Sequence, residues 1–344
     1  MPVVATLRQR VVVAQAGGTA LLMAAEYGSA ASVEVLLTLG AEIETADAEG
    51  RTALMRAAAR GKATCVDLLL ENGSNVEAAD KYGATALVKA AGQGSTACLE
   101  LLLARDAAVE AAGKDGRTAL IRAAGACGGS EASVELLLSK GAAVEAMDAD
   151  GWTALMRATG AGNASCMEVL LSRGAVVDVT DREGWTALLK AAELGETACA
   201  RALLGAGAAI EARTQFSQTA LMRAAGQPNA SCVELLLSHG AEIEATDEDG
   251  VTALMRAAKE GMEASVELLL QKGANIEATD EEGCSALIWA AATGPPARRP
   301  LAPCASYRSP HTPTITASRT QIHFPPLTTS ISPLKTKRCI GREG

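Results

Sequence analysis

The sequence predicts an all-α protein built as a solenoid of stacked helical pairs, followed by a disordered tail. The first observation is that a short string, such as Thr-Ala-Leu-Met-Arg-Ala-Ala, recurs along the 344 residues. The recurrences lie 33 residues apart, with one interval of 35. The second is that hydrophobic residues make up 49% of the chain but aromatic residues only 2%, so the core must consist of small aliphatic side chains. The strings begin at Thr19, Thr52, Thr85, Thr118, Thr153, Thr186, Thr219, Thr252 and Ser285.

Each repeat unit contains signals for two short helices and a turn. Thr52 has the side chain of a helix N-cap, the Ala-rich string after it favours helix, and Gly61 ends that helix. A second helix is expected over about residues 64–72, with apolar side chains on one face. The Asp-x-x-Gly sequence at residues 80–83 is typical of a tight turn. One unit cannot bury its own apolar face, so successive units must stack.

A 33-residue period with a Thr-Pro-Leu-His-x-Ala string is the signature of ankyrin repeats. The chain resembles the ankyrin-repeat family over roughly residues 14–294, with Ala53 in place of Pro and Met55 in place of His, and the same changes in other units. The resemblance implies helix-turn-helix units joined by β-turn or hairpin fingers. It also implies that the first helix of each unit lines a concave face where family members bind proteins.

The pattern divides the chain into three segments. Residues 1–18 are interpreted as a partial repeat or cap, and residues 19–294 as an array of about eight full repeats with a partial ninth. Residues 295–344 hold nine of the eleven Pro, together with many Ser and Thr and eight basic side chains against one acidic one. That composition predicts a disordered tail. The tail is either an interaction segment or a mis-predicted exon.

The charge of the chain disfavours two classes of partner. The net charge is −9, and the tail is basic, so the array itself is strongly acidic. Nucleic acids and anionic membranes are bound chiefly through Lys and Arg, so neither is expected. No apolar run approaches the ~20 residues of a membrane span, and the N-terminus does not have a secretory signal. We therefore expect a cytoplasmic and monomeric protein.

The sequence offers no support for catalysis. It contains three His, and it has no glycine-rich phosphate loop, nucleophile elbow or zinc-ligand spacing. The carboxylates recur with the repeat period, which is typical of surface columns and not of a converging acid–base pair. We expect no catalytic residues, no cofactor and no metal.

A column of cysteines opens the second helix of five units, and Ser takes its place in other units. Stacked helices lie ~8–10 Å apart, which is too far for disulfides between adjacent units. Exchange between Cys and Ser indicates a small, buried position. The five are Cys65, Cys98, Cys166, Cys199 and Cys232.

Two charged columns run along the units. One base lies on the first helix of seven consecutive units, and one acid lies after the second helix of each unit. Either the two columns pair with one another across neighbouring repeats, or the bases form a stripe that grips an acidic partner segment. The bases are Arg56, Lys89, Arg122, Arg157, Lys190, Arg223 and Arg256. The acids are Glu44, Glu77, Glu110, Glu145, Asp178, Glu211, Glu244 and Glu277.

Scarce aromatic residues gather in the turns of three successive units. Trp152, Trp185 and Phe216 each lie in the turn before the recurring string. Either each ring covers its own turn, or the rings anchor a partner, since Trp is common at binding hot spots. On the second interpretation they lie on the fingers and not in the core. The candidate partner-binding residues are Trp152, Trp185, Phe216, Arg157, Lys190 and Arg223.

The sequence thus predicts a protein-binding scaffold or adaptor that is not an enzyme, with another protein or peptide as its partner. The alternative is a fragment or targeting arm of a larger enzyme or signalling protein whose catalytic domain is absent from this chain. An in-frame catalytic domain after residue 294 would distinguish the two.

Overall fold

The computed structural model describes residues 20–126 and 130–293. The predicted N-terminal cap at residues 1–18 and the predicted tail at residues 295–344 lie outside the described residues. Helices alternate between a first and a second helix of each unit. The first helices are residues 20–27, α3 (Ala53–Ala59), α5 (Ala86–Gln93), α7 (Ala119–Ala124), α9 (Ala154–Gly160), α11 (Ala187–Leu194), α13 (Ala220–Ala225), α15 (Ala253–Glu260) and α17 (Ala286–Thr293). The second helices are α2 (Ala30–Thr38), α4 (Ala63–Glu71), α6 (Thr96–Leu103), α8 (Glu131–Ser139), α10 (Ala164–Ser172), α12 (Thr197–Gly205), α14 (Ser231–Ser238) and α16 (Glu263–Gln271).

The threonine that opens the string caps the first helix in most of the described units, as predicted for Thr52, whereas Thr85 makes no such bond. The Thr52 hydroxyl accepts a hydrogen bond from the Met55 backbone N–H, and the equivalent bond recurs in α7, α9, α11, α13 and α15. This bond satisfies one of the amides left free at a helix start. After α3 the chain reverses through Gly61, whose φ of +65° suits glycine. The local sequence therefore sets both ends of the helix.

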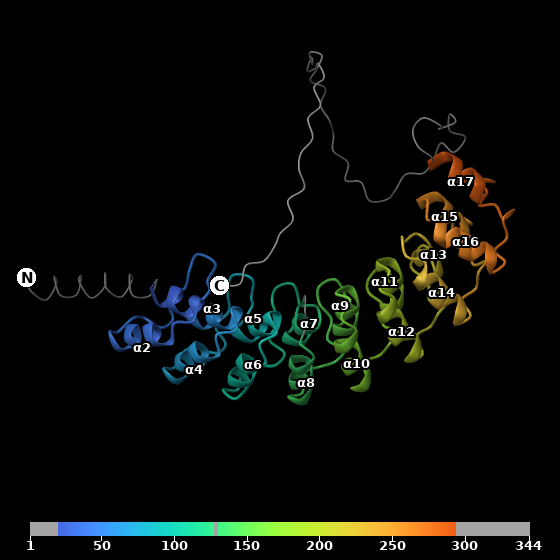
Figure 1. Cartoon of the computed structure of the whole chain (residues 1–344). Helices are drawn as coiled ribbons and strands as arrows, with labels where there is room; N and C mark the ends of the chain where they lie inside the picture. Colours follow the sequence, from blue (N-terminus) through green and yellow to red (C-terminus); the bar gives the residue numbers. More distant parts are fainter. Residues whose placement is uncertain (1–19, 127–129, 294–344) are drawn as a thin grey trace, which may run out of the picture. The chain divides into compact units, whose positions relative to one another are not determined.

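In successive units, helices of the same kind pack against each other. First helices contact the first helices of neighbouring units, second helices contact second helices, and Figure 1 shows them as two rows. The buried face of α4 is Cys65, Val66, Leu69 and Leu70, which agrees with the predicted apolar face. All five cysteines of the column have 0% exposure, which confirms a small, buried position. One continuous aliphatic core therefore runs between the two rows of helices.

The fingers are turns organised by an aspartate. In the second described finger, Asp80 Oδ1 accepts the backbone N–H groups of Tyr82 and Ala84, each at 2.9 Å. Adjacent fingers also bond to each other, because Lys81 N donates to Glu49 O at 2.9 Å. The fingers thus extend the stacking beyond the helices.

The acid column has a different role from the predicted pairing with the base column. Each of its acids from Glu44 to Glu244 accepts a backbone N–H of the following unit. Glu77 Oε1, for example, lies 2.8 Å from Ala108 N, and Glu145 Oε1 lies 2.9 Å from Val176 N. The prediction that the acid and base columns pair with one another is wrong, because these carboxylates are engaged by the backbone. These carboxylates therefore join each unit to the next through hydrogen bonds to backbone amides.

Candidate functional site

The base column pairs with the fingers of its own units. Lys89 Nζ lies 2.6 Å from Asp80 Oδ2, and Arg157 Nε lies 2.7 Å from Asp148 Oδ2. Both aspartate side chains are fully buried. Burial alone raises the pKa of Asp148, but hydrogen bonds from Trp152 N–H and Arg157, and the charge of Arg157, outweigh it and lower the pKa overall. These bases are therefore neutralised within the protein.

Two units lack the finger aspartate, and their bases find other partners. Gly113 replaces it in one unit, where Arg122 instead pairs with Asp115, 2.7 Å between Nη2 and Oδ2. Both side chains are more than a third exposed, so that ion pair is screened by solvent. Thr214 replaces the aspartate in the unit of α13, where Arg223 donates to Gln218 and to Glu193 of the preceding unit.

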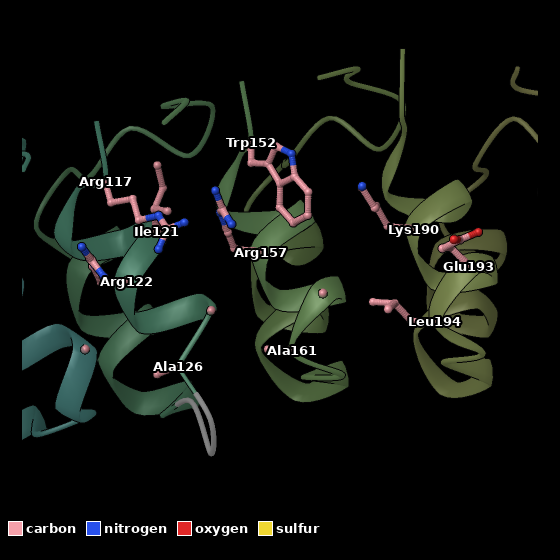
Figure 2. Close-up of a pocket in the computed structure, with 13 residues that line it drawn as sticks. Arg117, Ile121, Arg122, Ala126, Trp152, Arg157, Ala161, Lys190, Glu193 and Leu194 are labelled. Atoms are coloured by element: carbon pink, nitrogen blue, oxygen red, sulfur yellow. The ribbon is translucent and has the colours of Figure 1, made fainter. Parts of the chain in front are cut away.

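Lys190 is held by aromatic rings. Its Nζ lies 4.6 Å from the centroid of the Trp152 ring and 4.2 Å from that of Trp185. Arg157 and Arg223 add a cation beside each ring, at 4.2 Å from Trp152 and 4.5 Å from Trp185. Figure 2 shows the Trp152 ring between the side chains of Arg157 and Lys190. The result is a stack in which cations and indoles alternate across three units.

The aromatic residues differ in exposure. Trp185 is only 8% exposed and belongs to the core, so the expectation that all three rings lie clear of it is wrong for this one. Trp152 and Phe216 are half-buried. The Trp185 ring lies between Lys190 of its own unit and Arg223 of the next first helix. Phe216 lies on the following turn and does not line the groove described next.

An open groove of about 510 Å³ crosses the first-helix face at α7, α9 and α11. We call it the central groove. Figure 2 shows side chains of the three helices converging on it. Its walls combine apolar and cationic side chains with one acid. The residues that define it are Arg122, Trp152, Arg157, Lys190, Glu193 and Leu194.

Sequence reasoning missed part of this groove. Arg122 stands in the base column but is not among the candidate partner-binding residues, whereas the structure places it in the lining of the groove. Leu194 is 49% exposed at the end of α11. The other units have either a polar residue at this point, such as Arg60 or Gln93, or a small one, such as Ala161, so a large aliphatic side chain here was the available signal.

The described residues give little support for other kinds of functional site. No group of three or more His, Cys, Asp or Glu in residues 20–126 and 130–293 is placed to hold a metal ion. No helix there has the length and apolar character that crossing a bilayer requires. The central groove is therefore the site that we consider.

Comparison with family models gives one result. The model for ankyrin repeats matches residues 7–80, 75–148, 126–214 and 207–280. The chain belongs to the ankyrin-repeat family. Ankyrin repeats generally mediate contacts between proteins and are typically not catalytic. No curated protein matches the sequence significantly. The family, and not a relative, therefore links this groove to protein binding.

Proposed function

We propose that this ankyrin-repeat chain is a non-catalytic scaffold that holds another protein on its first-helix face, with the central groove as the main contact. It acts in the cytoplasm as a monomer of eight full repeats and a partial ninth. The finger tips beside the groove, at Trp152 and Phe216, extend the contact surface. The molar mass of the purified chain, measured by light scattering, tests whether it is a monomer.

One observation carries this proposal: an open groove brings together arginines and an exposed leucine from α7, α9 and α11 with Trp152 from the turn before α9. Trp and Arg dominate the binding energy of protein interfaces, especially where apolar contacts exclude water around them. Of the predicted site residues, Trp152, Arg157 and Lys190 line the groove, whereas Trp185 contacts Lys190 and Arg223 contacts Trp185. The scaffold thus presents a rigid surface built on helices.

A photo-crosslinking amino acid at Leu194 tests the proposal in cells, with one at Arg173 as control. Leu194 lies in the groove. Arg173 is exposed and is the C-cap residue of α10, a second helix, so it lies outside the groove. We expect a defined protein to be captured from Leu194 and not from Arg173. That protein should then lose affinity for the Leu194→Arg variant, which fills the groove without touching the core. Equal capture from both positions, or normal binding to Leu194→Arg, would contradict the proposal.

A further inference from the structure

The charge balance of the base column shows where the groove has an unsatisfied cation. Arg56, Arg157 and Arg256 each form an ion pair with the aspartate nine residues earlier in their own finger. Lys89 does the same, with a fully buried Asp80. In these units the charge of the base is therefore already neutralised by an aspartate of the protein itself.

Lys190 departs from that pattern although Asp181 stands nine residues before it. Among the residues that the structure describes, Lys190 forms no ion pair, and its Nζ lies against the rings of Trp152 and Trp185 instead. Ring faces attract a cation but carry no net charge, so none of the described carboxylates meets the ammonium in a direct ion pair. Burial lowers the pKa of Lys190, although Asp181 and Glu183 act in the opposite direction. The wall of the groove therefore holds a charge that would gain from an anion.

The acid nearest to this cation in the groove is already engaged. Glu193 Oε2 lies 3.3 Å from Arg223 Nη1. Arg122 also lines the groove, and its ion pair with the exposed Asp115 is screened by solvent, so its charge is also available to a ligand. Lys190 and Arg122 thus each give the groove a cation, on α11 and α7, while Trp152 and Leu194 offer apolar surface near Lys190.

We propose that the central groove binds an acidic peptide segment, with a carboxylate paired to Lys190 and a neighbouring apolar side chain packed on Trp152 and Leu194. This inference rests on the proposed function and specifies the chemistry of the partner. A nucleic acid fits less well, because the finger carboxylates Asp115 and Asp150 at the rim repel a continuous phosphate backbone.

Selection from a library of random short peptides displayed on phage, with the full chain as the target, tests the inference. We expect a consensus that contains Asp or Glu next to large apolar residues. The consensus peptide, and a copy with Asn or Gln for its acids, are then titrated by fluorescence anisotropy. We expect the amide copy to bind at least about tenfold more weakly, and the acidic peptide to weaken as salt rises.

Variants assign the binding to Lys190. Lys190→Met keeps the stem on the indoles but removes the charge, and should weaken the acidic peptide by about tenfold or more. Lys190→Arg keeps the charge, although its planar guanidinium stacks differently on the indoles, and should bind the acidic peptide more tightly than Lys190→Met does. Arg173→Gln removes one charge outside the groove and should leave binding unchanged. Thermal unfolding of each variant confirms that it is folded.

Two other outcomes separate the inference from the function on which it rests. Neutral or basic peptides that lose binding in Leu194→Arg would overturn the acidic partner while leaving the groove as a protein-binding site. An acidic consensus that binds Lys190→Met normally would also overturn the inference. If no selected peptide depends on Leu194, the proposed function itself fails, and the inference fails with it.

Discussion

Lys190 Nζ lies 4.6 Å from the ring centroid of Trp152 and 4.2 Å from that of Trp185, so one ammonium joins the turns of two successive units. Lys89, at the same point of another unit, instead meets Asp80 at 2.6 Å. The residue before the threonine of the recurring string is Ala84 in the unit of Lys89, and Trp152 and Trp185 in the two units whose rings contact Lys190. An indole there offers the lysine a surface that an alanine does not.

The burial of Lys190 predicts a pH dependence of stability. Burial, partly offset by the charges of Asp181 and Glu183, places the pKa of Lys190 in the folded chain below its ordinary value of 10.5. Between these two values the unfolded chain binds a proton that the folded chain does not, so stability rises with pH across that window. We expect wild type to gain stability relative to Lys190→Met as pH rises toward the ordinary value.

Urea unfolding midpoints at a series of pH values measure this difference. Lys272→Met is the matched control, because Lys272 is an exposed lysine at the end of α16. The difference in urea midpoint between Lys272→Met and the wild type should stay constant with pH. A constant difference for Lys190→Met as well would show that Lys190 keeps its ordinary solvation in the folded chain.

The two tryptophans should differ in their effect on stability. Trp185→Ala removes a ring that is only 8% exposed and leaves a cavity, which typically costs about 3–5 kcal/mol. Trp152 is half-buried, so Trp152→Ala should cost about 1–2 kcal/mol. Repeat arrays do not unfold strictly as two states, so hydrogen exchange in α11 and α13 should accompany the urea midpoints. Equal losses for the two variants would contradict the assignment of Trp185 to the core.

The helices were predictable from the sequence because their signals are local. The second helix expected over about residues 64–72 is α4, Ala63–Glu71, and Thr52 caps α3 as expected. The burial of Trp185 was not predictable, since it depends on how closely the next first helix approaches the finger. The choice of Lys190 between Asp181 and two indoles was not predictable either. Several groups lie within reach of its flexible side chain, and residue spacing alone does not rank them.

The acid column should stabilise the array through hydrogen bonds to the backbone. Glu77 Oε1 accepts from Ala108 N at 2.8 Å, so Glu77→Ala leaves that amide to solvent. We expect a loss of about 1 kcal/mol, and a smaller loss for Glu77→Gln, whose amide oxygen still accepts. Glu71→Ala, at the exposed end of α4, is the control for charge and helix propensity. If Glu77→Ala and Glu71→Ala are equally stable, the hydrogen bond contributes nothing measurable to the free energy of unfolding.

The buried cysteine column should resist alkylation in the folded chain. Burial raises the pKa of Cys199 and of Cys232 to about 11, so at pH 8 only about one thiol in a thousand is the reactive thiolate. Peptide-resolved mass spectrometry after iodoacetamide treatment should find both unlabelled in native buffer and labelled in denaturing urea. Since each unit contacts only its neighbours, Cys65, nearer one end of the array, should become labelled at a lower urea concentration than Cys166. Simultaneous labelling of Cys65 and Cys166 would show instead that the described array opens as one cooperative unit.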